Sequence, residues 1–267
     1  MGKIWVRSLF VATLLLALAG CGSSSSSSDR SSDGSGDNDP DTGNAPITGS
    51  QGPGGIWLGE MMTEAGGFYD AAGLITEDGE LHIVTADAEQ TVGTIRVSGS
   101  NFTATLTAYA ADGEVFEQNG KNIIQGSAKG TFVARKTFAG SASLGGVPAS
   151  QFLFLYDDLY ERATSLASLS GTYSKSDSTG YTQTYTITSD GSVTGSDTDG
   201  CALNGKLSIL NSNYNLFRIR VTVSNCDDLN GEYSGLAALT DWNGLVDTLI
   251  VSAAGPKFAI SGFIPRS

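Results

Sequence analysis

The sequence predicts an all-β protein with two tandem antiparallel meander barrels after a disordered amino-terminal tether. Three observations lead to this fold class. Short runs of Thr, Val, Ile, Tyr and Phe alternate with turns that contain Gly, Asp or Asn, which is typical of strands. Two stretches of about 100 residues repeat the same order of motifs. Charged residues make up only 16% of the chain, so strong helix formers are scarce.

Residues 1–20 have the pattern of a secretory signal peptide. Basic side chains lie near the start, an apolar run covers residues 9–18, and the small residues Ala19 and Gly20 precede Cys21. The apolar run is shorter than the roughly 20 residues that a transmembrane helix needs. We therefore expect export, with a mature chain that begins at Cys21.

The tetrapeptide Leu18-Ala19-Gly20-Cys21 resembles the lipobox of bacterial lipoproteins. The resemblance implies that the Cys21 thiol carries a diacylglycerol and that the new amino group is acylated, for example with palmitate. Two or more acyl chains hold a protein stably on a membrane. Gly22 stands where an Asp retains such lipoproteins at the inner membrane, which implies the outer membrane with either leaflet open. An ordinary signal peptide with a chance cysteine is the alternative.

Residues 21–54 are predicted to be the acylated cysteine and a disordered Ser/Gly/Asp linker. Such a composition cannot bury enough apolar surface to offset its ordering entropy. A flexible linker of this length spans about 30 Å, enough to hold a domain away from the lipid surface. A calcium site at Asp37, Asp39 and Asp41 is possible chemically, but a solvated run of charges is the simpler interpretation.

Residues 55–157 are expected to form the first barrel and residues 171–267 the second. A short helical link at 158–170 joins them, because acidic residues open this stretch and leucines recur within it. Consecutive hairpins without long crossovers predict a meander, and about eight strands can close into a barrel without edges.

Each expected strand is a short run of β-formers between turn residues. In the first module we expect strands near 56–62, 72–76, 80–86, 91–97, 102–109, 128–138 and 150–156. In the second we expect strands near 171–176, 181–188, 192–196, 202–210, 216–224, 231–240, 246–252 and 257–264. Three pairs of motifs support an internal repeat: 75–79 with 187–191, 93–97 with 205–209, and 130–132 with 231–233.

A Gly-x-aromatic motif opens each module, as Gly55-x-Trp57 and Gly171-x-Tyr173. This motif resembles the first strand of the lipocalin and avidin class of small barrels. The resemblance implies that Trp57 and Tyr173 plug one end of their barrels, and the helical stretch before Gly171 also fits that class. The second module departs from the pattern by using Tyr.

The chain has three cysteines, and the lipid would occupy Cys21. In an exported protein the remaining pair, Cys201 and Cys226, is predicted to form a disulfide. Metal binding by this pair is the weaker alternative, since the single histidine, His82, is far away in sequence.

Strand pairing supports the same disulfide. Pairing Leu207 with Ile219 matches the apolar faces of their strands, whereas a one-residue slip would invert them. This register places Cys201 opposite Asn225, and a bulge near Asn225 would bring the Cys226 sulfur within bonding distance.

The sequence supplies little material for catalysis, and we expect no catalytic residue, metal or cofactor. His82 alternates within a strand, and no second histidine supports a metal site or a triad. Asp157 and Asp158 are interpreted as the start of the helical link. Asp197-x-Asp199-Gly200 resembles the beginning of a calcium loop but lacks the later ligands, so we interpret it as a turn.

The net charge of −13 argues against nucleic-acid binding, which needs clustered Lys and Arg. We therefore expect a non-enzymatic, lipid-anchored envelope protein with a binding or structural role at the outer membrane or cell surface. Its membrane partner is reached through Cys21, and the protein or ligand partner is unknown. The alternative is a lipocalin-like carrier of a small apolar ligand, and an envelope hydrolase is the third hypothesis.

One predicted strand, 150–156, is apolar on both faces. One face should enter the barrel, and we expect the other to contact the second module. A patch for a partner is the alternative.

Overall fold

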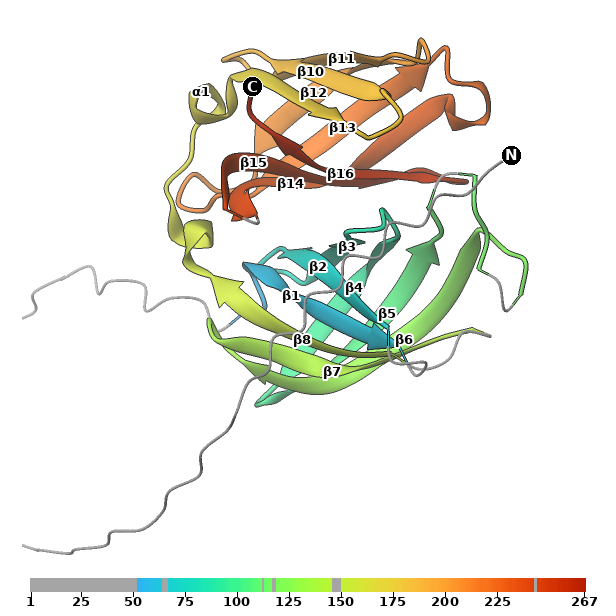
Figure 1. Ribbon diagram of the computed structural model, residues 1–267. Helices are drawn as coiled ribbons and strands as arrows, with labels where there is room; N and C mark the ends of the chain where they lie inside the picture. Colours follow the sequence, from blue (N-terminus) through green and yellow to red (C-terminus); the bar gives the residue numbers. More distant parts are fainter. Residues whose placement is uncertain (1–51, 64–66, 112, 117–118, 146–149, 243) are drawn as a thin grey trace, which may run out of the picture. The chain divides into compact units, whose positions relative to one another are not determined.

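The computed structural model describes residues 52–63, 67–111, 113–116, 119–145, 150–242 and 244–267 (Figure 1). The predictions for the signal peptide, Cys21 and the linker up to residue 51 lie outside the described residues. Among the described residues, no helix is both long enough and apolar enough to cross a membrane.

The first sheet is a closed barrel of eight antiparallel strands in sequence order, because β1 pairs with both β2 and β8. Its strands are β1 (Gly55–Thr63), β2 (Phe68–Ile75), β3 (Glu80–Thr85), β4 (Gln90–Ser98), β5 (Asn101–Tyr109), β6 (Ile123–Val133), β7 (Thr137–Leu144) and β8 (Ser150–Asp157).

The second sheet is also an eight-stranded antiparallel meander. Its strands are β9 (Gly171–Ser176), β10 (Thr182–Ile187), β11 (Ser192–Asp197), β12 (Ala202–Ile209), β13 (Phe217–Ser224), β14 (Gly231–Trp242), β15 (Leu245–Ala254) and β16 (Ala259–Pro265). Its two edges meet through an isolated bridge between Tyr173 and Arg266. The Ser267 N–H also donates to the Thr172 carbonyl at 2.9 Å. The predicted fold class is confirmed, and the arrangement is consistent with a lipocalin-like fold.

Two short helical segments lie between the sheets: η1 (Asp158–Glu161) and α1 (Leu166–Leu169). The Asp157 carboxylate accepts the Leu159 N–H at 3.0 Å and so caps η1. This is the cap chemistry that acidic residues supply at a helix start. Ser165 caps α1 in the same way, accepting from the Ser168 N–H.

One strand of the first barrel differs from the prediction. The expected strand 128–138 merges the end of β6 with the start of β7, which the sequence interpretation missed. The turn between them contains Ala134, Arg135 and Lys136, and none of these residue types marks a turn. Arg135 nevertheless has a φ of 55°, a conformation that Gly or Asn usually supplies.

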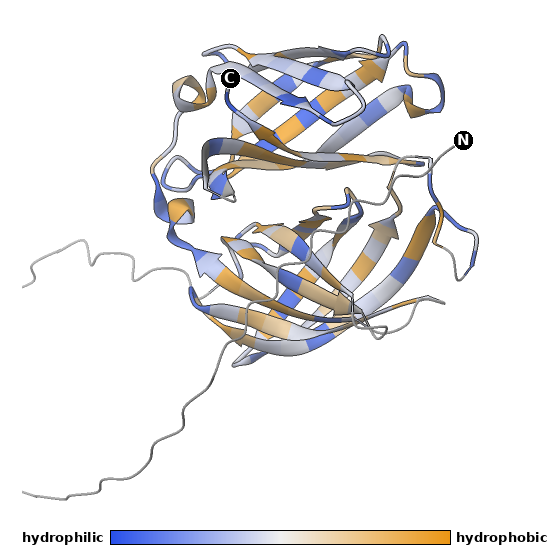
Figure 2. Cartoon of the chain, viewed as in Figure 1, coloured by the Kyte–Doolittle hydropathy of each residue, from blue (hydrophilic) through white to orange (hydrophobic). Residues whose placement is uncertain are grey.

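Alternating residues along the strands fill the two barrel interiors, an alternation that is visible in the hydropathy colouring of Figure 2. The first core is aromatic. Trp57 lies with its ring centroid 5.7 Å from that of Phe132 and 6.0 Å from that of Phe138. Phe102 and Phe138 are 4.5 Å apart. The second core is mostly aliphatic, with Leu207, Ile219 and Val221 among its buried residues.

Two of the three motif pairs occupy equivalent positions. In the turns between β2 and β3 and between β10 and β11, Gly79 and Gly191 have φ values of 92° and 83°. The Gly79 carbonyl accepts the Ile95 N–H at 2.8 Å, and the Gly191 carbonyl accepts the Leu207 N–H at 2.7 Å. The two modules therefore share their turn chemistry as well as their strand order.

The third motif pair is not equivalent. Gly130 lies near the end of β6 and pairs with Phe102 at the start of β5. Gly231 opens β14 and pairs with Val223 near the end of β13. The two glycines belong to corresponding strands but lie at opposite ends of them, so this match reflects similar composition.

Candidate functional site

The two predicted plug residues occupy the same local environment. Trp57 and Tyr173 are each 0% exposed. The Trp57 Nε1–H donates to the Pro53 carbonyl at 3.2 Å, and the Tyr173 hydroxyl donates to the Leu169 carbonyl at 2.9 Å. Each polar atom bonds to the residue four positions earlier, which satisfies a polar group that burial would otherwise leave unpaired.

The predicted disulfide between Cys201 and Cys226 is present, with the two Cα atoms 4.7 Å apart. The predicted register is also confirmed, because Leu207 pairs with Ile219. Asn225 adopts a φ of 57° directly after β13. This change of backbone direction comes just after the last paired residue of β13 and brings Cys226 beside Cys201.

One acidic residue, Asp197, lies beside this disulfide. The two sulfurs and an Asp197 carboxylate oxygen lie within 4.8 Å of one another, but sulfurs joined in a disulfide are not thiolate ligands. The Asp197 Oδ1 instead accepts the N–H groups of Asp199 and Cys201, each at 3.0 Å. This is the turn geometry that the Asp197-x-Asp199-Gly200 sequence predicts.

His82 lies between the two barrels and is only 4% exposed. Its Nδ1 is 2.9 Å from the Ser252 Oγ, and its Nε2 is 3.1 Å from the Glu80 Oε1. Arg218 donates to both Glu80 carboxylate oxygens at 2.5 Å. The hydrogen bonds from His82 and then from Arg218 lower the pKa of Glu80 to about 2. This carboxylate is therefore charged across the physiological pH range.

The sequence Ser252, His82, Glu80 has the residue types of a hydrolase triad, but its geometry fits a structural role. Ser252 is 0% exposed, so a substrate carbonyl cannot approach its Oγ. Glu80 is also held by Arg218 through both oxygens. The network joins β3 to β13 and β15 and supplies both ring nitrogens of the buried His82 with partners.

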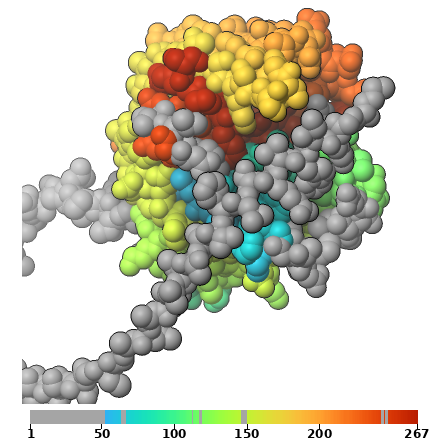
Figure 3. All heavy atoms as spheres, viewed as in Figure 1, coloured from blue at the N-terminus to red at the C-terminus, as the bar shows by residue number. Residues whose placement is uncertain are grey.

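An apolar cluster surrounds this network and completes the contact between the barrels. The first barrel contributes outward-facing residues of β1 to β3, and the second contributes residues of β14 to β16. Figure 3 shows carboxyl-terminal atoms, in red, beside atoms of the first barrel. The cluster contains Ile56, Ala72, Leu74, Val84, Tyr160, Leu216, Leu236, Ala238, Ile250 and Phe263.

The outer face of β8 corrects one expectation. Phe152 and Phe154 enter the first barrel, as expected, with exposures of 6% and 0%. Leu153 and Leu155 are 53% and 56% exposed, and neither belongs to the apolar cluster between the barrels. Strands β1 to β3 make that contact instead. The apolar outer face of β8 is left open to solvent.

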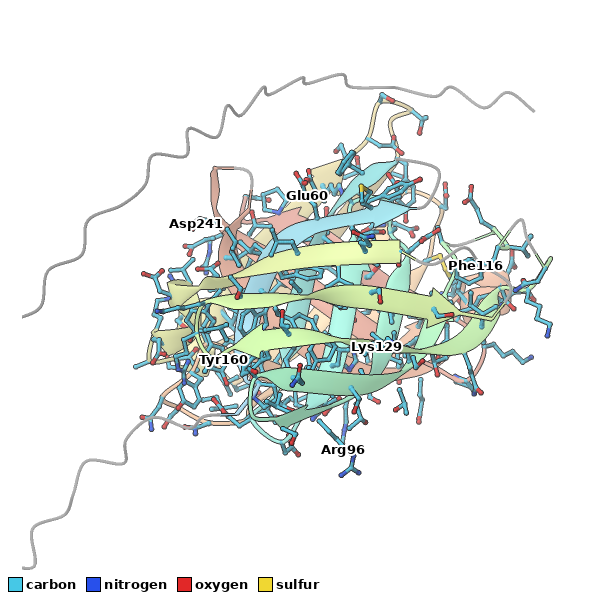
Figure 4. The ribbon with its side chains drawn as sticks, turned by 90° about the horizontal axis from the view of Figure 1, so that it is seen from below. Glu60, Arg96, Phe116, Lys129, Tyr160 and Asp241 are labelled. Carbon is cyan, nitrogen blue, oxygen red and sulfur yellow. A yellow bond between two sulfur atoms is a disulfide. The ribbon has the colours of Figure 1, made fainter. Side chains whose placement is uncertain are left out.

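This open face borders a hollow of about 970 Å³ on the outside of the first barrel. The hollow follows two cross-strand rows, one through Thr103, Lys129, Ser141, Gln151, Met62 and Phe68, the other through Asn101, Thr131, Ala139, Leu153 and Glu60. Figure 4 labels Glu60 of β1 and Lys129 of β6, both of which line it.

Two glycines thin the wall of the barrel beneath this hollow. Gly130 and Gly140 pair with each other in the row between the two outer rows. A Cβ at Gly130 would lie 2.6 Å from the Gly140 Cα, so no side chain fits here. The core rings of Phe102 and Phe152 flank the glycine pair and also line the hollow.

The second barrel has a smaller and more polar cavity at the end that carries the disulfide. Its volume is about 210 Å³. Tyr185 and Gln183 of β10, together with Tyr181 just before this strand, form a chain of hydrogen bonds along the cavity wall, which we call the ladder. Tyr185 donates to the Gln183 Oε1 at 3.1 Å, and the Gln183 Nε2 donates to the Tyr181 Oη at 3.0 Å. Tyr181 donates to the Asp197 Oδ2 at 2.8 Å.

Burial raises the pKa of both phenols, Tyr181 and Tyr185, to about 12. For Tyr181, the hydrogen bond to the Asp197 carboxylate contributes a second, smaller increase. Both hydroxyls are therefore protonated at neutral pH, and the ladder keeps its direction from Tyr185 toward the carboxylate.

Each barrel also has a small interior pocket below these surfaces. The pocket measures about 20 Å³ in the first barrel and about 50 Å³ in the second. Tyr185, Leu203 and Ile260 line both the 50 Å³ pocket and the 210 Å³ mouth cavity. An apolar floor therefore continues directly below the polar ladder.

The sequence interpretation missed both the outer hollow and the mouth cavity. The hollow depends on which of two apolar faces of β8 stays exposed. The ladder had a sequence signal, since Tyr181, Gln183 and Tyr185 alternate and so share a strand face. The chain matches no model of a known protein family, no curated protein and no solved structure.

Proposed function

We propose that this chain is a lipid-anchored, non-enzymatic envelope protein that binds a partner protein through the outer hollow of its first barrel. The membrane attachment rests on the Leu18-Ala19-Gly20-Cys21 motif and its resemblance to a lipobox. The outer membrane is the proposed location, because Gly22 follows the cysteine.

The exposed side of β8 carries the binding part of this proposal. Leu153 and Leu155 are each more than half exposed, and Leu153 lies beside a hollow that also contains Met62 and Phe68. Contiguous apolar surface on a soluble domain marks interaction sites. Lys129 and Glu60 add one charge of each sign at the hollow, which suits a protein surface of mixed charge better than a lipid surface.

The non-enzymatic part is supported by the placement of the reactive side chains. His82 and Ser252 are buried in the contact between the barrels. Within the described residues, neither lines the hollow or the mouth cavity.

Metabolic labelling tests the anchor. Radioactive palmitate should label the wild-type protein in growing cells, and the Cys21→Ala variant should remain unlabelled. Label that persists in the variant would refute acylation at this cysteine.

Photo-cross-linking in intact cells tests the binding surface. A photoreactive amino acid at Gln151, which lines the hollow, should form a defined adduct with another envelope protein. The double variant Leu153→Gln and Leu155→Gln should lose the adduct. The matched control replaces the exposed Ile209 and Leu210 of the second module with Gln and should keep it. An adduct between two copies of this chain would contradict the proposed partner protein and would show that the hollow mediates self-association.

The mouth cavity favours a second candidate, the carrier of a small ligand. Carriers of drug-sized apolar molecules need cavities of roughly 300 Å³ or more. The interior pockets of 20 and 50 Å³ are far smaller, and the mouth cavity of about 210 Å³ also lies below this size. A carried ligand would therefore be smaller than a drug-sized molecule and would lie in the mouth of the second barrel.

A further inference from the structure

The mouth of the second barrel is the place where the two repeated modules diverge in chemistry. Their strand registers match: Gly73 pairs with Ile83 in the first barrel, as Tyr185 pairs with Gly195 in the second. Likewise, Ala71 pairs with Thr85 where Gln183 pairs with Asp197. The second barrel therefore has an amide, a phenol and a carboxylate at positions where the first has small or neutral side chains.

The large and small residues of this pair change places between the barrels, and the glycine makes room for the Tyr185 ring. A Cβ at Gly195 would lie 2.2 Å from the Tyr185 Cδ1. The Tyr185 ring therefore packs directly on the glycine, where the first barrel has Ile83. The aromatic ring and the glycine opposite it form one unit, and this unit shapes the boundary between the mouth cavity and the apolar floor.

The ladder has a consistent polarity. Tyr185, Gln183 and Tyr181 each donate to the next residue, and the last donor faces the Asp197 carboxylate. Both phenol protons are thus used within the wall, and the Gln183 amide keeps one N–H. The Asp197 carboxylate at the end of the ladder can only accept, so this part of the wall favours a ligand that donates hydrogen bonds.

The charge of the cavity points in the same direction. Among the described residues that line the mouth, Asp197 is the single ionisable carboxylate and no Lys or Arg is present. Two tyrosine rings line the same cavity. A carboxylate with aromatic rings is the combination that attracts organic cations, through ion pairing and cation–π contact. The negative net charge of the chain, −13, adds a long-range attraction for cations.

We propose that the mouth of the second barrel binds a small organic ammonium ion with an apolar group. The ammonium lies near Asp197 and the tyrosine rings, and the apolar group enters the floor formed by Leu203 and Ile260. The volume of about 210 Å³ restricts the ligand to a small molecule. This proposal rests on the second barrel alone and does not require partner binding by the first.

Calorimetric titration of the full chain, purified in detergent, tests the proposal with 2-phenylethylamine as the probe. The neutral analogue 2-phenylethanol and the anion phenylacetate have the same ring and similar size. The amine should bind saturably, with the alcohol at least about tenfold weaker and the anion weaker still, because only the amine pairs with a carboxylate. Absence of saturable amine binding, or equal binding of the alcohol, overturns the proposal.

Two variants with the same change of charge locate the site. Asp197→Asn keeps an oxygen to accept the N–H groups of Asp199 and Cys201, so the turn should persist. It should weaken amine binding about tenfold. Asp190→Asn removes a carboxylate from the turn at the opposite end of the same hairpin and should change the affinity less than about twofold. Equal losses in both variants would assign the effect to net charge and overturn the site.

A second pair of variants separates the aromatic contribution from folding. Tyr185→Phe keeps the ring and Tyr185→Leu removes it. The leucine variant should bind the amine about fivefold more weakly than the phenylalanine variant. Equal affinities of the two variants would show that the Tyr185 ring does not contribute to amine binding.

Discussion

Arg218 of the second barrel donates to both carboxylate oxygens of Glu80 in the first, at 2.5 Å each. This bidentate ion pair joins residues 138 positions apart in sequence. His82, in turn, contacts the same carboxylate and the Ser252 hydroxyl of the second barrel. The contact between the two modules is therefore polar at this point and apolar around it.

Removal of the guanidinium should weaken the contact between the barrels. Arg218→Met leaves the Glu80 carboxylate partly buried without its cation, and we expect a loss of about 1–2 kcal/mol, since part of the pair is open to solvent. Urea unfolding measures this loss. The double variant with Glu80→Gln should recover part of it, and strictly additive losses would show that the two side chains do not interact.

The same carboxylate should make stability depend on pH. The pKa of Glu80 falls from an ordinary value of 4.5 to about 2 in the folded protein, through hydrogen bonds from His82 and Arg218. The unfolded chain therefore binds this proton first as the pH falls. The stabilisation is complete above pH 4.5 and is lost progressively toward pH 2.

Denaturation midpoints at a series of pH values test this dependence. The wild-type protein should lose more stability than Glu80→Gln between pH 5 and about 2.5. Parallel curves for the two proteins would contradict the assigned role of Glu80.

The disulfide should stabilise the second barrel through its loop. Cys201 and Cys226 are 25 residues apart, and closing such a loop is worth on the order of 3 kcal/mol in the chain-entropy model. The Cys201→Ser and Cys226→Ser double variant should unfold at correspondingly lower urea concentration. Reducing agent should lower the midpoint of the wild-type protein and leave that of the double variant unchanged.

The equivalent turn glycines should be equally intolerant of substitution. A Cβ at Gly79 would lie 2.3 Å from the Ile95 carbonyl oxygen, and one at Gly191 would lie 2.5 Å from the Leu207 carbonyl oxygen. Together with the positive φ, Gly→Ala should cost about 2 kcal/mol or more at either site.

Gly99 provides the matched control for these two substitutions. It has a φ of 62°, but an added Cβ would have no neighbouring atom within 4 Å. Gly99→Ala should therefore cost only about 1 kcal/mol, from backbone strain alone. Equal losses at all three sites, measured by thermal unfolding, would show that the backbone contact adds nothing.

Features that depend on neighbouring residues or on strand alternation were predicted well. The meander follows from consecutive hairpins, and the Cys201–Cys226 disulfide follows from the cysteine count. The Leu207–Ile219 register follows from apolar alternation, because a shift by one residue would turn the core face outward. The sequence did not separate β7 from β6 because the turn between them contains Arg135 with a positive φ, a conformation that arginine rarely adopts.

The all-β class, the two modules and the pairing of the cysteines can be predicted from the sequence, since these rest on local pattern and on hairpin geometry. Which strand faces pack together depends on the folded chain. Strand β8 is apolar on both sides, so alternation cannot say whether Leu153 and Leu155 contact the second barrel or solvent. The β10–β11 hairpin places Tyr181 and Gln183 beside Asp197, but the cavity that they line also needs Ala259, Ile260 and Ser261 of the distant strand β16. Faces of a strand are set by its sequence, but the surface opposite each face is set by the packing of distant strands.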